Sequence, residues 1–144
     1  MTWQEISASV KSGKTTIIIP TGGTEQNGPH MVTGKHNSIV RYTSGKIAEQ
    51  LGNALVAPVL PYVPEGKINP PEGHMNYAGT ISIGEEHFAA VLEDAARSFK
   101  QHGFKLICFV GDSGGNQNAQ AAVAQKLTAE WQNNNVRVLH VSDY

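Results

Sequence analysis

The chain has one cysteine, few charged residues and no long apolar run. The single Cys108 excludes a disulfide within the 144 residues, and its place in an apolar run predicts a small buried side chain in a strand. Charged residues make up 16% of the sequence and the net charge is −1. This balance gives no reason to expect nucleic acid or an anionic membrane as a partner. Near-neutrality leaves little repulsion between copies, so we expect a homo-oligomer.

Targeting and membrane-spanning segments are also missing. No stretch approaches the roughly 18 apolar residues of a transmembrane helix, so we expect no membrane partner. The N-terminal residues lack the basic and apolar regions of a signal peptide. These absences predict a cytoplasmic protein; the alternative is an exported protein whose signal peptide has been removed.

Two hydrophobic periodicities alternate along the chain. Apolar runs predict strands over 15–20, 54–60, 105–110 and 137–141. Three- and four-residue spacings predict helices over 3–12, 38–51, 85–102 and 117–133. Asn37 is the expected N-cap of the second helix, and Pro58 indicates that the second strand ends early or lies near a sheet edge. The third strand is uniformly apolar, which predicts a central position.

This alternation predicts an α/β fold with three layers, α/β/α, around a mostly parallel sheet of about four strands. We expect a single domain over 1–144. The sequence ends directly after a predicted strand. Either that strand lies at the sheet edge, or the chain is a C-terminally truncated part of a longer protein. The irregular stretch over 61–82 is long enough to indicate a functional loop or a contact surface.

Polar side chains gather in three loops that follow predicted strands. The loop after the first strand is rich in glycine and carries Glu25, Asn27, His30 and His36. The second loop carries Glu65, Glu72, His74 and Asn76, and the third carries Asp112, Ser113 and Asn116. In an open α/β sheet, ligands bind beyond the carboxyl ends of the strands. We therefore expect the three loops to converge on one functional site.

A divalent metal is one interpretation of these residues. Glu25, His36 and Asp112 would supply carboxylate and imidazole ligands for Zn²⁺ or Mn²⁺, with His30 as a further ligand or a donor to a ligand. Such a metal lowers the pKa of bound water and polarises a carbonyl, which is the chemistry of amide hydrolysis. In that case the three ligand side chains should enter one cleft within about 5 Å of each other. The alternative is that Glu25 is a hydrogen-bonding anchor of the loop and the two histidines are solvated.

Other site types have weaker support. Gly114 and Gly115 precede a predicted helix, where anions can bind, but neither standard nucleotide-binding glycine motif is present. Ser113 lacks the G-x-S-x-G context of a hydrolase nucleophile. Three histidines lie away from the expected site and are assigned no role: His87, His102 and His140.

Three motifs resemble those of the creatininase (creatinine amidohydrolase) family. The run from Pro20 to His36 is similar to P-x-G-x-x-E-Q-H-G-P-H-L-P-L-x-x-D, and the run from Gly73 to Ser82 is similar to a stretch containing H-x-x-F-P-G-T-I-S. Residues 111–116 are similar to N-G-H-G-G-N. The resemblance implies a parallel-rich α/β fold, a divalent metal centre, hydrolysis of cyclic or linear amides, and homo-oligomers. The family's later H-A-G-E-x-E-T-S-like motif has no counterpart, so the resemblance covers its N-terminal half.

The family's metal-binding positions are only partly retained. Glu25 matches the metal-binding glutamate, whereas Asn27 stands where a histidine is usual. His36 stands at the bridging aspartate and Ser113 at the histidine of the third motif. Asp112, next to Ser113, suggests that aspartate and histidine have exchanged places. The resemblance then implies one ion of Zn, Mn or Fe, rather than two, held by Glu25, His36 and Asp112.

The sequence therefore predicts a divergent metal-dependent amidohydrolase of this family that acts on a small cyclic or linear amide. Asp112 or a bound hydroxide would act at the carbonyl, and His30 is the second catalytic candidate. The alternative hypothesis is a catalytically decayed domain that binds small molecules or mediates oligomerisation, which Asn27 and Ser113 favour.

Overall fold

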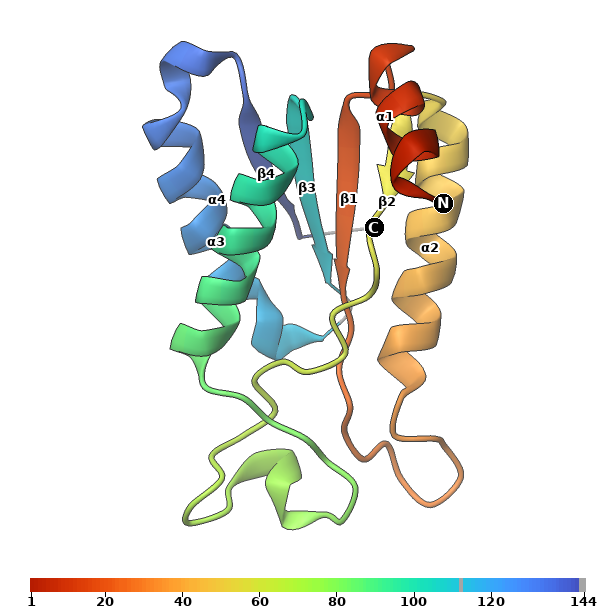
Figure 1. Ribbon diagram of the computed structural model, residues 1–144. Helices are drawn as coiled ribbons and strands as arrows, with labels where there is room; N and C mark the ends of the chain where they lie inside the picture. The colour runs from red at the N-terminus through yellow and green to blue at the C-terminus, as the bar shows by residue number, and fades with distance from the viewer. Residues whose placement is uncertain (112, 143–144) are drawn as a thin grey trace.

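Four parallel strands form the centre of the protein. Figure 1 shows the computed structural model, which describes residues 1–111 and 113–142. The sheet has the order β2-β1-β3-β4 and each neighbouring pair is parallel. The strands are β1 (Thr16–Thr21), β2 (Ala54–Val56), β3 (Leu106–Gly111) and β4 (Arg137–Val141).

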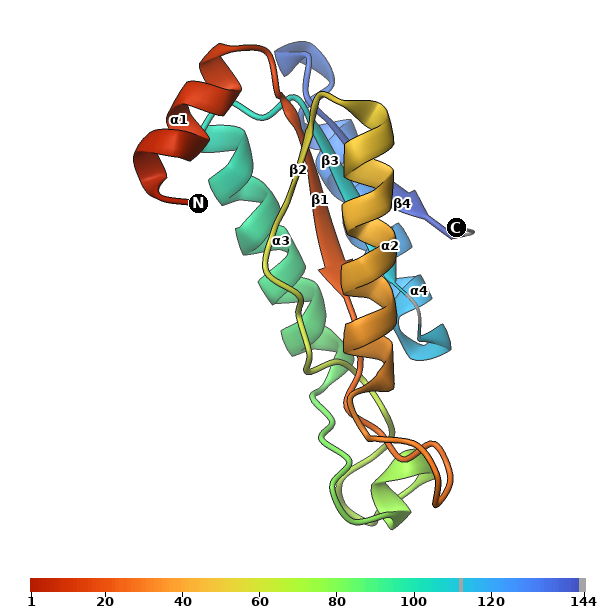
Figure 2. The same cartoon turned by 90° about the vertical axis from the view of Figure 1, so that its right-hand side faces the viewer.

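Helices cover both faces of this sheet. They are α1 (Trp3–Lys11), α2 (Lys35–Leu51), α3 (Glu85–Gln101) and α4 (Gln117–Glu130), with short 3₁₀ turns at Gly73–Asn76, Gly114–Asn116 and Gln132–Asn134. One face carries α2 and the other carries α3 and α4 (Figures 1 and 2). The three-layer fold with four parallel strands predicted from the sequence is confirmed. Within the described residues, none of the helices is long and apolar enough to cross a membrane.

The alternation of side chains along the strands builds two apolar cores. In β1, Ile17 and Ile19 belong to the larger core, which includes Phe88 and Leu92 of α3 and Leu127 of α4. Ile18 belongs instead to the smaller core beneath α2. This is the two-residue period expected of a strand that is buried on both faces.

Cys108 and Val110 of β3 also belong to the core beneath α2, together with Val40. Burial raises the pKa of the Cys108 thiol, which keeps it in its neutral form. The prediction of a small buried side chain is confirmed.

Element ends follow the local chemistry, with one correction. β2 stops at Val56, before Pro58, and lies at the sheet edge, while β3 is central. Asn37 is not the N-cap of α2, because the helix already begins at Lys35 after Gly34. The Asn37 side chain instead accepts a hydrogen bond from the Gly23 N–H at 3.1 Å and donates to Thr24 Oγ1 at 3.4 Å. It stabilises the loop after β1 rather than the helix end.

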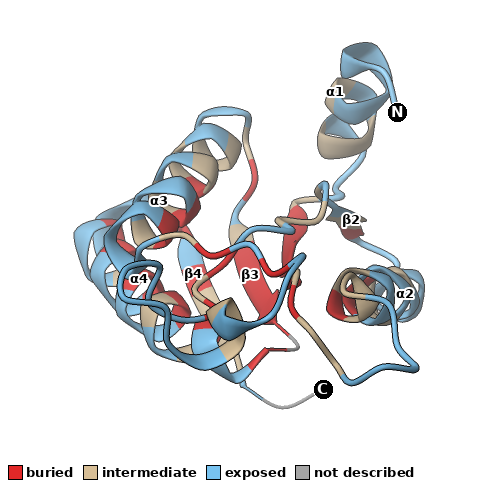
Figure 3. Ribbon diagram, turned by 90° about the horizontal axis from the view of Figure 1, so that it is seen from below, coloured by how far each residue is buried: buried red, intermediate tan, exposed pale blue. Residues whose placement is uncertain are grey.

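The connections at the carboxyl ends of the strands extend together beyond that end of the sheet (Figure 1). The loop after β1 and the long segment between β2 and α3 are joined by a bridge between Thr24 and Ile81, in which the Ile81 N–H donates to the Thr24 carbonyl at 2.9 Å. Viewed from this end, the buried strands lie at the centre and the exposed loops lie in front of them (Figure 3).

Candidate functional site

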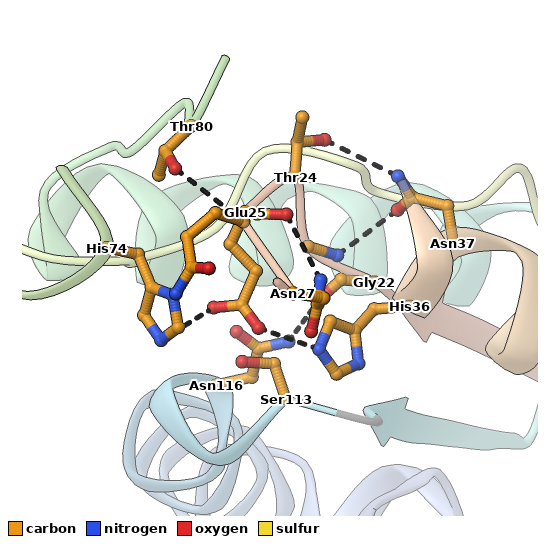
Figure 4. A network of polar contacts seen from close by, with 12 residues as sticks. Gly22, Thr24, Glu25, Asn27, His36, Asn37, His74, Thr80, Ser113 and Asn116 are labelled. Atoms are coloured by element: carbon orange, nitrogen blue, oxygen red, sulfur yellow. Dashed lines mark hydrogen bonds and ion pairs between the residues drawn. The ribbon is translucent and has the colours of Figure 1, made fainter. Parts of the chain in front are cut away.

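Glu25 lies at the centre of a cluster of carboxyl and imidazole groups. It follows β1 and is 6% exposed. Its Oε1 is 2.8 Å from Nε2 of His36, and its Oε2 is 3.1 Å from Nε2 of His74 (Figure 4). His36 comes from the first turn of α2 and His74 from the 3₁₀ turn of the long loop. Three separate segments therefore meet at one carboxylate.

Glu65 is a second buried carboxyl group beside Glu25. It is 6% exposed and lies close enough to Glu25 for the two carboxyl groups to influence each other's pKa. Its Oε1 is buried and has no hydrogen-bond partner among the described residues. Because buried polar atoms are rarely left unpaired, this oxygen marks a place where a ligand could bind.

The two carboxyl groups have opposite pKa shifts. Burial raises the pKa of Glu65, and the hydrogen bond and negative charge of Glu25 raise it further, to about 8. Burial also acts to raise the pKa of Glu25, but hydrogen bonds from Glu65 and His36 and the nearby His74 lower it overall. The two carboxyl groups therefore share one proton near neutral pH.

A cavity of about 640 Å³ opens over this cluster. Its lining combines the cluster with groups from the loop after β3 and the start of α3: Glu25, His36, Glu65, Lys67, His74, Glu85 and Ser113. Pockets of this size hold small ligands. The cavity lies where ligands bind in open α/β sheets, beyond the carboxyl ends of the strands.

Amide side chains position the loop after β3. Asn116 is fully buried, and its Nδ2 donates to the Gly22 carbonyl at 2.9 Å. Gln117 donates from Nε2 to the carbonyls of Gly111 at 2.9 Å and Ser113 at 3.2 Å. Its Oε1 lies 2.6 Å from His140 Nε2, and because this oxygen can only accept, the histidine nitrogen donates. The loop is thereby held against both β1 and β4.

The structure brings only some of the predicted site residues together. The structure brings Glu25 and His36 together, while Asp112 lies outside the described residues, so the three-residue ligand set stays a prediction. His30 is exposed and does not line the cavity. The Asn27 side chain donates to the backbone carbonyl of Glu25 at 3.1 Å.

The sequence places Glu65 and His74 in the second loop but assigns neither of them a role. They are distant in sequence from Glu25 and approach it only because the long loop folds back along the loop after β1. The sequence features that indicate a role for these two residues are the length of the loop and the carboxylate and imidazole that it carries. Gln117 was missed entirely, because a helical glutamine has no distinctive sequence pattern.

The donor chemistry fits a divalent cation. Within residues 1–111 and 113–142, no group of three His, Cys, Asp or Glu residues is already arranged to hold a metal ion. However, carboxylates and imidazoles are the ligands that Zn²⁺ and Mn²⁺ take. The unpartnered Glu65 oxygen beside Glu25 adds a buried acceptor that a cation would satisfy.

Comparison of the sequence with known proteins shows the family to which the chain belongs. The sequence model of the creatininase family, described as creatinine amidohydrolase, matches residues 1–143. The chain belongs to the creatininase family. The resemblance of its three motifs is thereby confirmed.

The similar proteins include proteins named as peptidases and one named as an amidohydrolase. The chain is 34% identical over 133 residues to the mycofactocin precursor peptide peptidase of Mycobacterium tuberculosis strain H37Rv, covering 86% of this chain and 50% of that protein. It is 29% identical over 107 residues to the creatinine amidohydrolase of Pseudomonas putida, covering 74% and 40%. The chain spans about half the length of these creatininase-family relatives.

Solved creatininase structures share the fold. A crystal structure of creatinine amidohydrolase superimposes with a TM-score of 0.80 at 24% identity, covering 99% of this chain and 55% of that one. A creatininase structure described as the manganese form also gives a TM-score of 0.80 at 24% identity, covering 99% of this chain and 56% of that one. At this identity the likeness establishes the fold alone.

Proposed function

We propose that this chain provides the active-site cavity of a metal-dependent hydrolase that cleaves a C–N bond in a small cyclic or linear amide. The observation that carries the proposal is the buried Glu25 carboxylate held between two imidazoles under the cavity. The names of the relatives, a peptidase and an amidohydrolase, both denote enzymes that hydrolyse amide bonds. The manganese and zinc forms of creatininase support a divalent metal in the family.

Different residues around the cavity would bind the metal, act on the substrate and orient it. Glu25, His36 and Asp112 would hold one divalent cation, which supplies Lewis acidity to polarise the substrate carbonyl and to acidify water. Asp112 would also act at the carbonyl. His30 is exposed, so as a second catalytic group it would approach the substrate from outside the cavity. Lys67 and Glu85 line the cavity with opposite charges and would orient the polar ends of an amide.

Hydrolysis assays test this proposal. The purified chain would be incubated with creatinine and with short peptides, and the ring-opened or newly formed amine products would be quantified. Glu25→Ala and His36→Ala should lower the rate by about 100-fold or more, because each removes a proposed ligand. His87→Ala is the matched control, since this histidine is exposed and does not line the cavity.

Two outcomes would contradict the proposal. One is a hydrolysis rate that is the same in wild type, Glu25→Ala and His36→Ala. The other is a folded wild-type protein that binds these amides without converting them, with or without added Zn²⁺ or Mn²⁺. The second result would instead support the hypothesis of a binding module.

A further inference from the structure

We propose that Glu65 and His74, both from the long loop between β2 and α3, are additional ligands of the cation bound by Glu25 and His36. The sequence resemblance assigns neither residue to the metal. The inference rests on the proposed function, because it extends the ligand set of the same site. The site would then be assembled from the long loop as well as from the segment that follows β1.

Glu65 has the environment of a ligand. Its side chain lines the cavity, lies against Glu25, and is more than nine-tenths buried. A buried carboxyl oxygen without a partner is destabilising, and Glu65 Oε1 is such an atom in the part of the chain that is described. A cation between the two carboxyl groups would satisfy this oxygen.

His74 approaches the same carboxylate from the side opposite His36. Its Nε2 is 3.1 Å from Glu25 Oε2, and the His36 contact to Oε1 measures 2.8 Å. Ligand atoms on one tetrahedral zinc ion lie about 3.3 Å apart, so small side-chain shifts would let these groups share an ion. Gln26 Nε2 lies 3.4 Å from His74 Nδ1 and donates to it, a contact that restrains the ring.

The backbone around both residues is held in place before any ligand binds. The His74 N–H donates to the Glu65 carbonyl at 3.2 Å. The Glu65 N–H donates to Ser82 Oγ at 2.9 Å, and that hydroxyl donates to the Gly66 carbonyl at 2.7 Å. The two proposed ligands are therefore fixed relative to each other, which reduces the entropy lost on binding.

Metal titration tests this inference without any measurement of hydrolysis. Metal-free protein would compete with a chromophoric chelator for Zn²⁺, and Co²⁺ would be added separately to record its visible absorption spectrum. Loss of a group behind a metal ligand typically weakens binding by about 10–100-fold, and loss of a ligand should cost at least as much. We therefore expect Glu65→Gln and His74→Ala each to weaken Zn²⁺ binding at least about tenfold and to change the Co²⁺ spectrum.

Glu72→Gln is the matched control, because Glu72 lies on the same loop but is exposed and paired with Lys67. It should leave the Zn²⁺ affinity and the Co²⁺ spectrum unchanged. Circular dichroism of each metal-free variant would verify folding. If Glu65→Gln does not fold, Glu65→Asp gives the same comparison, since the shorter side chain keeps its charge but withdraws from the cation.

The outcomes separate this inference from the proposed function. If wild type binds Zn²⁺ and loses it in Glu25→Ala and His36→Ala, while Glu65→Gln and His74→Ala bind like Glu72→Gln, this inference is wrong and the proposed metal site stands. If wild type binds neither Zn²⁺ nor Co²⁺, the metal site fails and this inference fails with it. If Glu65→Gln and His74→Ala bind Zn²⁺ more weakly than wild type while Glu72→Gln binds it equally well, the result supports this inference.

Discussion

His36 Nε2 lies 2.8 Å from Glu25 Oε1, and both side chains are buried beyond the end of β1. The two residues are eleven positions apart and are brought together because α2 begins at Lys35. This early start places His36 in the first turn of the helix. The histidine that the sequence resemblance puts at the family's aspartate position thus contacts Glu25 directly.

The raised pKa of Glu65 predicts an unusual pH dependence of stability in metal-free protein. Folding raises this pKa from an ordinary value near 4.5 to about 8. The stabilisation from the bound proton is fully present below about pH 4.5 and is lost as the pH rises to about 8, because the unfolded state ionises first. Glu25, whose pKa is lowered, has the opposite dependence and loses its contribution as the pH falls below about 4.5.

Glu65→Gln isolates the first of these effects, since glutamine cannot ionise. The free energy of unfolding of the variant should rise relative to wild type by on the order of 2 kcal/mol between about pH 5 and about pH 8. Urea unfolding at the two pH values measures this, with Glu72→Gln as the control that should track wild type. If the Glu65→Gln and wild-type values stay parallel, Glu65 does not hold the proton.

Gly23 allows the close approach of Glu65 to the loop after β1. A Cβ at this position would overlap Glu65 Oε1. Gly23→Ala should therefore displace the carboxyl group and lower the free energy of unfolding by about 1–3 kcal/mol. In α2, a Cβ on Gly45 meets nothing within 4 Å, so Gly45→Ala should stabilise by about 0.5–1 kcal/mol through helix propensity. Thermal unfolding of both variants measures these changes in stability. Equal changes in Gly23→Ala and Gly45→Ala would contradict the steric explanation.

Gln117 should determine the order of the loop after β3. Gln117→Ala removes the donor to the carbonyls of Gly111 and Ser113, so we expect a loss of about 1–2 kcal/mol in the free energy of unfolding. Hydrogen exchange of a peptide covering 111–117 should also become faster. Gln125→Ala, on an exposed position of the same helix, should change neither. Unchanged exchange in Gln117→Ala would show that other contacts hold the loop.

The layers of the fold could be predicted because hydrophobic periodicity reports burial directly. Ile17 to Ile19 read as a strand and are buried on both faces, and Pro58 correctly indicated the short edge strand β2. Asn37 misled because an asparagine before a helical pattern resembles an N-cap, whereas its side chain binds the Gly23 N–H in the folded chain. Local sequence could not reveal that competing tertiary partner.

The convergence of the three loops on one site could be predicted from the sequence, but the residues that contact each other there could be predicted only in part. Glu25 and His36 lie within one short motif, so their proximity could be anticipated. Glu65 and His74 reach the cluster through the path of a long irregular loop, and no local rule specifies that path. Their role depends on tertiary pairings such as Thr24 with Ile81, which are visible only in the folded chain.

The metal content of the purified protein tests the central claim most directly. Elemental analysis of the wild type, Glu25→Ala and His36→Ala would be made on matched preparations shown to be folded. We predict stoichiometric Zn, Mn or Fe in the wild type and its loss in both variants. A fully folded wild-type protein that carries no metal, and takes up none when Zn²⁺ or Mn²⁺ is supplied, would contradict the account.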